Sequence, residues 1–477
     1  MILFYYLVSS KNKTQISNGG LSIMFFRTYI TIALCAFFLF SQAAFAQLQV
    51  DKTVSSTNPK LNRERGLNML DEIKTLIKEN YYDKNFRGIN LDERFKLAKE
   101  KIKTLDTNRQ IFRVIAQVVL DFNDSHTRFY PPNRAYRVEY GFTMQMIGQN
   151  CFVTDVKKGS DAEEKGLKVG DLISGVGDFA PTRDNLWKMY YLFYALDPQE
   201  KIKLYVISPN EKNEREIEVK AVFKSPKEQS REAEKRRKKK VESPYKCQKV
   251  DFETIACKLE TFSVETKYID KMMKETEGFK KLILDLRGNG GGYVKTEEYL
   301  TGHFFDRNVK IADFIMRDKT KERIAKTQKE KVFKGDLIVL IDSDSASASE
   351  VFARVIQLEK RGKVVGDQSA GAVMTSYFIT MSNWRGASGF ETVSFFGMNI
   401  TIADLVMSDG KRLENIGVMP DYPVGPTGQA LFEKLDPVLS YAAELLGTKI
   451  SSSDAGKFGF IIQKAEDEDE ESDEKEN

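Results

Sequence analysis

The hydrophobic positions of the chain change their spacing twice along its length, and each spacing predicts a different kind of structure. Between residues 60 and 120 they recur at helical spacing, as in amphipathic helices. From 138 to 224 they alternate in short runs separated by glycine turns, which predicts strands. From residue 245 onward, continuous apolar runs alternate with amphipathic stretches, as in an α/β sheet. We therefore expect an α+β multidomain protein with a helical domain, a β-domain and an α/β core.

The stretches before, between and after these domains differ in composition and set their boundaries. Arg27, an apolar run at 29–40 and Ala-Phe-Ala at 44–46 are typical of a secretory signal, with translation starting at residue 1 or at Met24. An uncleaved anchor is the alternative. We expect the acidic tail to be disordered. The predicted signal, helical domain, β-domain, charged linker, core and tail are residues 1–46, 55–137, 138–224, 225–244, 245–448 and 449–477.

The net charge of +4 conceals a basic run in the linker and an acidic run in the tail. The basic run, residues 227–240, could contact an anionic membrane surface, but its composition favours a solvated charged linker. It carries no interleaved aromatic residues on which bases could stack, so we expect no nucleic-acid partner.

Cysteines and histidines are few, which limits both disulfides and metal sites. After removal of the signal, Cys151, Cys247 and Cys257 remain, and an odd number argues against a disulfide framework. Cys247 and Cys257 could pair or could simply pack among apolar neighbours. No Cys or His cluster has metal-ligand spacing, so we expect no metal and no cofactor. The two histidines are His126, at the end of the helical domain, and His303, whose apolar surroundings predict a structural role.

A buried strand, a turn of small residues and a helix follow one another between residues 336 and 359. A strand that stops at a helix N-terminus brings free backbone N–H groups and small side chains together. This arrangement suits a serine nucleophile beside the donors that stabilise an oxyanion, while a serine that only caps the helix is the simpler alternative. The pattern itself does not choose among Ser345, Ser347 and Ser349.

A second strand, at 281–286, runs into a glycine-rich loop at 288–292. The loop lacks the G-K-[ST] ending and the G-x-G-x-x-G spacing of phosphate-binding loops. Glycines let backbone N–H groups approach a reacting carbonyl closely. The loop therefore predicts an oxyanion hole, in which the loss of one donor typically costs about 3 kcal/mol of activation barrier.

These motifs, L-I-L-D-L-R-G-N-G-G-G, S-A-S-A-S-E and R-L-E-N-I-G-V-M-P-D, closely resemble those of the C-terminal processing (tail-specific) serine peptidase family, and they occur in that family's order. The resemblance covers about residues 60 to 445. It implies a ClpP/crotonase-like α/β catalytic core with Ser347 as the nucleophile. It further implies that the oxyanion donors are the N–H of Ala348 and that of Gly290 or Gly291.

The β-domain resembles a PDZ domain through its G-L-K-V-G-D-L-I segment at 166–173. The resemblance implies that Gly141 and Phe142 occupy the loop that binds a peptide's terminal carboxylate. A PDZ groove captures a C-terminal tail by adding it as an extra strand. A packing module without a ligand is the alternative.

The chain departs from the tail-specific pattern at the catalytic base. Those enzymes use a Ser–Lys dyad, but Ala372 stands here in the lysine position. The related tricorn-core and retinoid-binding-protein-like branch takes its base from a D-x-H-T-like segment, which residues 124–127 match. This resemblance implies that His126 takes the proton of Ser347 while Ser125 and Glu414 hold the ring.

Two simpler alternatives remain open at this point: Asp124 could orient the ring of His126, and Glu414 could be a surface residue. An ordinary imidazole has a pKa of about 6.5, so the expected activity rises between roughly pH 6 and 7.5.

The sequence thus predicts an exported serine endopeptidase, periplasmic, cell-envelope associated or secreted, that cleaves polypeptides near C-terminal tails or in unfolded segments presented by its PDZ domain. The first rival is a catalytically inactive PDZ-containing peptide-binding protein on the same fold. The second rival is a crotonase-type acyl-CoA enzyme, against which the export signal and the PDZ domain argue.

Overall fold

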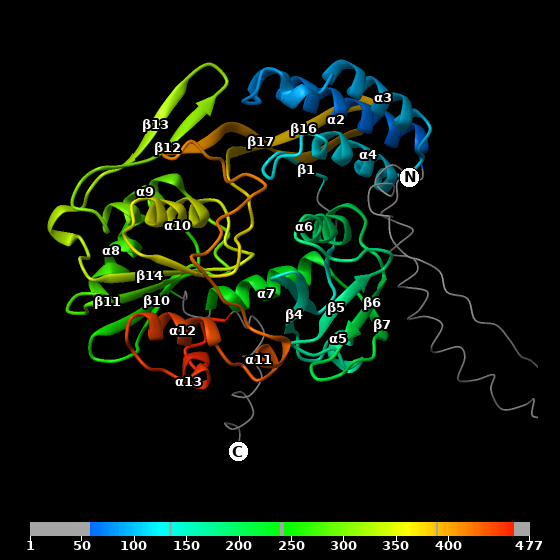
Figure 1. Ribbon diagram of the computed structural model, residues 1–477. Coiled ribbons are helices and arrows are strands. Elements are labelled where there is room, and N and C mark those ends of the chain that lie inside the picture. Colours follow the sequence, from blue (N-terminus) through cyan, green and yellow to red (C-terminus); the bar gives the residue numbers. More distant parts are fainter. Residues whose placement is uncertain (1–57, 133–135, 239–242, 388–389, 462–477) are drawn as a thin grey trace, which may run out of the picture.

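The computed structural model describes residues 58–132, 136–238, 243–387 and 390–461, which form a helical layer, a β-domain and an α/β core (Figure 1). The expected signal at 1–46 lies outside the described residues. Within the described ranges, no helix is both long enough and apolar enough to cross a membrane.

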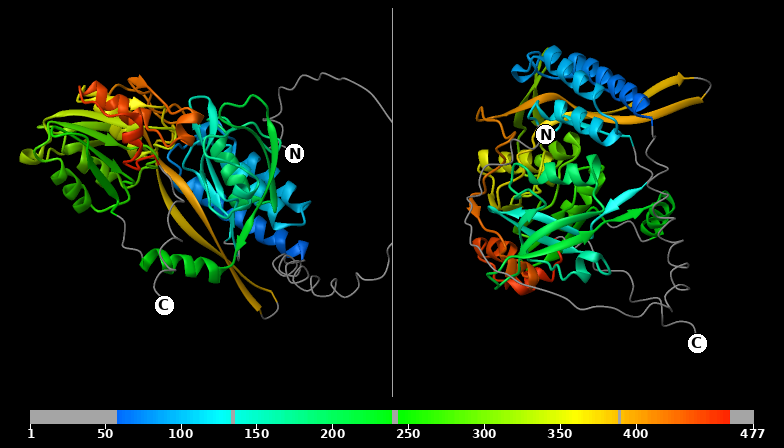
Figure 2. Two further views of the ribbon diagram at one scale, coloured as in Figure 1. Left: turned by 90° about the horizontal axis from the view of Figure 1, so that it is seen from below. Right: turned by 90° about the vertical axis from the view of Figure 1, so that its right-hand side faces the viewer.

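The helical layer lies against a long antiparallel hairpin from the C-terminal half of the chain. Its helices are α2 (Pro59–Asn80), α3 (Leu91–Lys103) and α4 (Asn108–Leu120), with the short turn η1 (Phe86–Gly88) between the first two. The hairpin is β16 (Met374–Ala387) and β17 (Phe390–Met407), and β1 (Arg128–Tyr130) pairs beside it. Phe396, Met398 and Ile400 of β17 complete the helical core. Figures 1 and 2 show the helices lying along the hairpin. The predicted helical domain therefore does not close its core alone.

The β-domain is an antiparallel sheet in the order β3-β4-β5-β6-β7. Its strands are Phe142–Ile147, Asn150–Val156, Leu172–Val176, Lys201–Ile207 and Arg215–Lys220. The helical segments α5 (Asp161–Glu164), α6 (Leu186–Tyr190) and η2 (Tyr191–Leu196) complete it, and β2 (Arg137–Glu139) pairs with β8 (Val222–Lys224) next to it. Among the described strands β3 pairs with β4 alone, so β3 is an edge strand of this sheet.

The α/β core is a six-stranded sheet in the order β18-β15-β14-β11-β10-β9, in which β9 alone is antiparallel to its neighbour. The strands, in chain order, are Tyr245–Lys249, Thr254–Leu259, Lys281–Asp285, Asp336–Ile341, Lys363–Gly366 and Tyr422–Pro423. One face packs on α8 (Thr266–Glu275), α9 (Val294–Gly302) and α10 (Ala348–Leu358). The other face packs on α12 (Pro437–Leu445) and α13 (Ser452–Gly456), which follow α11 (Gly428–Phe432).

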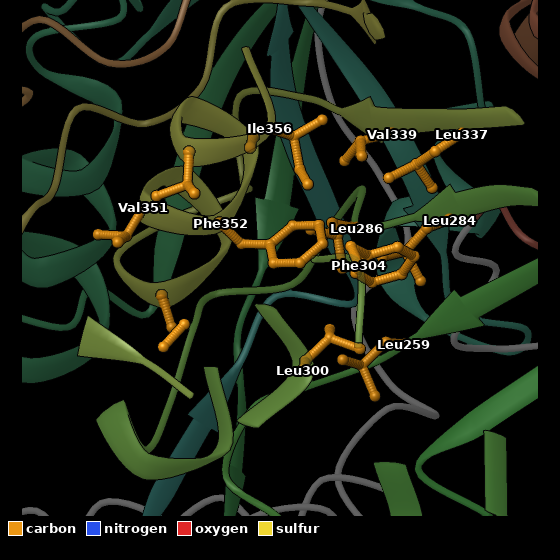
Figure 3. Packing of buried hydrophobic residues seen from close by; sticks show 14 of the residues in the cluster. Leu259, Leu284, Leu286, Leu300, Phe304, Leu337, Val339, Val351, Phe352 and Ile356 are labelled. Carbon is orange, nitrogen blue, oxygen red and sulfur yellow. The ribbon is translucent and has the colours of Figure 1, made fainter. Parts of the chain in front are cut away.

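The core is apolar on both faces of the sheet because its parallel strands are buried on both sides. Figure 3 shows Phe352 of α10 and Phe304, just after α9, packed over Leu286. A separate ribbon, β12 (Val309–Met316) and β13 (Thr320–Ala325), joins the core to β17, and η3 (Lys329–Lys331) follows it.

Two loops that carry the candidate chemistry emerge at the same edge of this sheet. β11 and β14 are parallel neighbours, with Asp285 opposite Leu340. Because parallel strands end together, the glycine loop after Asp285 and the serine turn after Ile341 lie side by side.

Two boundary predictions need correction, and the structure settles one alternative that the sequence left open. The linker at 225–244 contains a helix, α7 (Pro226–Lys238), rather than only solvated chain. The predicted disordered tail at 449–477 begins too early, because α13 and Phe460 pack on the sheet and Phe460 is buried. Cys247 and Cys257 form a disulfide between β9 and β10, which decides the alternative that their spacing left open.

Candidate active site

Ser347 sits at the sharp turn between β14 and α10. Its φ of 54° and ψ of −114° lie in a region that non-glycine residues rarely adopt, a form of strain that is typical of functional sites. The surroundings hold it there, because the Ser347 N–H lies 3.0 Å from the Ala372 carbonyl and 2.9 Å from Glu350 Oε2. Ser347 is also the N-cap residue of α10, the position that the simpler capping alternative gives it.

The structure separates the three serines that the sequence could not distinguish. The Ser345 hydroxyl donates to the Leu286 carbonyl at 2.8 Å, and the Ser349 hydroxyl donates to the Asn289 carbonyl at 2.8 Å; both residues are fully buried. Ser347, in contrast, lines a cavity of about 130 Å³. Only the middle serine of the turn therefore faces a space that a substrate could enter.

The glycine loop lies directly against the nucleophile turn. Gly291 has a φ of 94°, and a side chain there would come within 2.8 Å of Ser347 Cβ. Its own N–H donates to Asn289 Oδ1 at 2.9 Å. Within the described ranges no acceptor lies on the N–H of Gly290 or of Ala348. Of the two glycines that the sequence left as alternatives, Gly290 thus has the available donor.

Charged side chains fix the two loops in place. Asp342 Oδ1 accepts hydrogen bonds from the N–H of Gly288 at 2.9 Å and of Ser345 at 3.0 Å, and so joins the glycine loop to the serine turn. Below them, Arg287 pairs with Asp285 and with Asp436 of the α12 N-terminus. Because these ions are buried and mutually satisfied, they hold the loop without leaving an unpaired charge.

His126 faces the same cavity as Ser347, although it belongs to the segment between α4 and β1. Its Nδ1 lies 2.7 Å from Ser125 Oγ, which in turn donates to Glu414 Oε2 at 2.9 Å. An ionised carboxylate only accepts, so Ser125 must accept its other bond from Nδ1–H. That leaves Nε2 of His126 as the unprotonated nitrogen.

Glu414 is buried and is held by three donors: the N–H of Ser125 at 2.6 Å, the Ser125 hydroxyl, and the N–H of Val373 at 2.8 Å. Burial raises the pKa of the Glu414 carboxyl above its ordinary value, and the hydrogen bonds from Ser125 and Val373 oppose the shift. The alternative of an exposed surface carboxylate is therefore wrong.

Asp124 does not orient the imidazole ring. Its carboxylate accepts from the backbone N–H of His126 and Thr127 and from the hydroxyls of Tyr81 and Thr401. It therefore anchors the His126 segment to α2 and β17. His303 is buried at the end of α9, with Nδ1 3.3 Å from the Lys331 carbonyl, and does not line the Ser347 cavity.

Burial lowers the pKa of the His126 imidazole to about 4, with the positive charge of Arg128 in the same direction and Asp124 opposing. The imidazole is therefore neutral well below its ordinary range, which moves the expected rise in activity to a lower pH than the range of roughly 6 to 7.5 that an ordinary imidazole predicts.

We expect kcat/KM for a small ester to rise with pH around a midpoint near 4, because the base becomes active as His126 loses its proton. A profile between pH 3 and 8, with folding followed by circular dichroism, measures this. A midpoint at 6.5 or above would contradict the burial of the ring.

Glu350 is a residue whose role the sequence reasoning missed. It is fully buried, and its carboxylate accepts from the N–H of Ser347, Gly371 and Ala372 and from the Ser369 hydroxyl, at 2.6–2.9 Å. Burial raises its pKa to about 7, and these hydrogen bonds oppose the rise. The acid three residues after Ser347 was a visible signal, since a capping box places Glu there.

We expect Glu350→Gln to lower kcat by about 10-fold to 100-fold, because an amide NH₂ would meet backbone donors and shift the nucleophile turn. Glu359→Gln at the other end of α10, where the carboxylate pairs with Arg307, is the matched control. Steady-state ester hydrolysis by both variants measures the difference. If the two variants had equal rates, Glu350 would not be needed to position Ser347.

Ala372, the residue in the predicted lysine position, lies next to Ser347. Its carbonyl accepts from the Ser347 N–H and its own N–H donates to Glu350. It offers only a methyl group. Among the described residues, no group of three or more His, Cys, Asp or Glu side chains is arranged to hold a metal ion.

Residues 255–424 match Peptidase family S41, and this range contains the glycine loop, the serine turn and Glu414. The α/β core is therefore similar to the peptidase domain of family S41. The match begins after His126 and the β-domain, so it covers Ser347 but not His126.

Several curated relatives of this chain are named as C-terminal processing enzymes. The "C-terminal processing peptidase, chloroplastic" of Tetradesmus obliquus is 24% identical over 388 residues, covering 72% of this chain and 74% of that protein. The "Tail-specific protease" of Haemophilus influenzae is 26% identical over 271 residues, covering 52% of this chain but only 36% of that protein. The resemblance to the C-terminal processing family is thus confirmed.

A solved structure described as mature CPAF aligns with a TM-score of 0.60 at 14% sequence identity, covering 84% of this chain and 98% of that one. At this identity the likeness concerns the fold alone. It supports a mixed α/β multidomain fold that extends beyond the matched core.

Proposed function

We propose that the chain is a serine endopeptidase that cleaves polypeptides near C-terminal tails or in unfolded segments by a Ser–His mechanism. The observation that carries the proposal is the cavity shared by Ser347, on its strained turn, and His126, whose tautomer is set by Ser125 and Glu414. The names of the relatives support a tail as the substrate.

In the proposed mechanism the Ser347 hydroxyl attacks the scissile carbonyl carbon, and its proton passes to Nε2 of His126. The carbonyl oxygen becomes an oxyanion and accepts from the N–H of Gly290 and Ala348. The imidazolium then gives its proton to the leaving amine as the C–N bond breaks. Water, deprotonated by His126, releases the acyl group from Ser347.

The cavity wall supports recognition of an extended apolar segment. Beside Ser347 and His126, it is formed mainly by Val294, Val351, Val373, Met374 and Leu405. Arg323 also reaches the cavity, but its charge is paired with Glu297 and Glu298. Arg323 therefore presents no uncompensated charge to a substrate in the cavity.

We further propose that the PDZ-like β-domain captures the tail, with Gly141 and Phe142 in the carboxylate-binding loop, and that the protein acts outside the cytoplasm. Its β3 is an edge strand that begins at Phe142, as strand addition requires.

A fluorophosphonate probe tests the enzymatic proposal. Such probes phosphonylate only an activated serine, so the wild-type protein should be labelled and the labelled peptide should contain Ser347. An unlabelled, folded protein would instead support the inactive peptide-binding alternative. Binding of a CoA thioester at the glycine loop would support the crotonase-type alternative.

A further inference from the structure

The guanidinium of Arg323, on β13, forms part of the wall of the cavity that holds Ser347. The Arg323 side chain is only 5% exposed, and two of its three nitrogens are bound to α9. Nε donates to Glu298 Oε1 at 2.9 Å, while Nη2 donates to the Glu297 carboxylate and, at 3.4 Å, to the Val294 carbonyl. Figure 1 shows the β12–β13 ribbon beside α9.

The third nitrogen of Arg323, Nη1, is left for the cavity. Within the described ranges no hydrogen-bond acceptor lies on Nη1, and Nη1 is not among the unpartnered side-chain atoms that are sealed off from solvent. Nε and Nη2 are both directed at α9. Nη1 is therefore the nitrogen that reaches the cavity, and it has two N–H groups with which to donate.

Apolar side chains line the same cavity, namely Val294, Val351 and Leu405. The Val351 N–H donates to the Ser347 carbonyl at 3.0 Å, so Val351 lies one turn of α10 after the nucleophile. In a bound polypeptide, the residue whose carbonyl carbon is attacked carries its side chain on the neighbouring atom. That side chain is therefore the part of the substrate nearest to this wall. It needs an apolar stem and, at its end, an acceptor for Nη1 of Arg323.

The charges around Arg323 favour a neutral acceptor. Its single positive charge is paired with two carboxyl groups, those of Glu297 and Glu298. Burial raises the pKa of the Glu297 carboxyl, and the charge of Arg323 opposes the rise. A substrate carboxylate would bring a third acid to this pair, and a substrate ammonium would meet the guanidinium, so either charge would lose its water without a matching partner. A side-chain amide oxygen accepts a hydrogen bond without bringing a charge.

We propose that Arg323 makes the site selective for a neutral amide side chain, that of glutamine or asparagine, on the residue whose carbonyl Ser347 attacks. The amide oxygen accepts from Nη1 of Arg323, and the methylene stem packs on Val351 and Leu405. The inference rests on the proposed peptidase function and names its substrate class at this position. An apolar side chain of the same length would cover Nη1 and leave it without a partner, which a site with a fixed donor penalises.

Four peptides that are identical except for Gln, Met, Glu or Lys at one central position test the preference on the wild-type protein. Met has the length of Gln without its acceptor, and Glu has the shape of Gln with a charge. We expect kcat/KM for cleavage after Gln to exceed that after each of the other three by about 10-fold to 100-fold. Mass spectrometry of the products should find Gln at the new C-terminus, and a preference for Gln at the new N-terminus would contradict the proposal.

Arg323→Lys tests the role of the guanidinium while keeping a positive charge beside Glu297. The ratio of cleavage after Gln to cleavage after Met should fall about 10-fold, because the ammonium stays with the two glutamates and no donor reaches the substrate. A purely structural role would lower both rates together and leave the ratio unchanged. Arg317→Lys is the matched control, since Arg317 lies after β12 of the same ribbon, donates to the Tyr81 carbonyl and does not line the cavity.

Glu298→Gln is a second variant that leaves Arg323 in place, in case Arg323→Lys does not fold. It removes one of the two carboxylates, so cleavage after Glu should rise roughly 10-fold relative to cleavage after Gln. An unchanged ratio would contradict the charge argument.

Fluorophosphonate labelling separates this inference from the proposed function. A labelled wild-type protein that cleaves after Met as fast as after Gln overturns the inference alone. A folded protein that is neither labelled nor able to cleave any of the four peptides counts against the proposed peptidase function.

Discussion

Ser347→Ala abolishes proteolysis and fluorophosphonate labelling, with a loss of at least about 10³-fold in turnover, while the protein stays folded. The loss is expected because no other hydroxyl of the turn reaches the cavity. The fold should persist because Ala replaces a small residue, and the Ser347 backbone contacts to Ala372 and Glu350 use the N–H rather than the side chain. Casein digestion and labelling measure the effect.

The neighbouring serines are built-in controls for this prediction. Ser349→Ala leaves the buried Asn289 carbonyl without its donor, so it should destabilise the protein by about 1 kcal/mol yet keep labelling at Ser347. Ser345→Ala should behave similarly at the Leu286 carbonyl. Full proteolysis by Ser347→Ala would require the nucleophile to be sought at one of these two positions.

Local chain patterns predicted those parts of the site that lie within one strand–turn–helix unit. The nucleophile turn and the glycine loop are each read from a strand that ends in small residues, and parallel pairing then places the two together. Which serine points outward could not be read in this way. The answer depends on two carbonyls, those of Leu286 and Asn289, that another loop supplies.

Parts of the site that depend on residues far apart in the sequence could be predicted only from the family resemblance, or could not be predicted. Ser125 and Glu414 are 289 positions apart, and no periodicity links them. The role of Glu350 depends on residues 369–372 passing beneath α10, so its motif suggested only a helix start. The pKa of His126 likewise follows from burial created by distant segments. The helical layer shares its core with β17, which no local pattern reveals.

Variants of the proposed base and of the residues that hold it should lower kcat by different amounts. His126→Ala should lower kcat on the order of 10²-fold or more, because Ser347 loses its proton acceptor. Ser125→Ala and Glu414→Gln should lower kcat less, because the imidazole remains but its Nδ1–H and tautomer are no longer held.

His303→Ala is the control, since that ring is buried away from the cavity, and its effect should be on stability rather than turnover. Adding Ala372→Lys to His126→Ala should not restore activity. A lysine works as a base only when burial holds its amine neutral. The Ala372 N–H donates to the carboxylate of Glu350, and a carboxylate this close favours the charged form of an amine. Single-turnover ester hydrolysis across these variants measures the series. If His126→Ala kept full activity while Ser347→Ala was inactive, the hypothesis of proton transfer through Ser125, His126 and Glu414 would be wrong. His303 could not replace His126, because it does not line the cavity of Ser347.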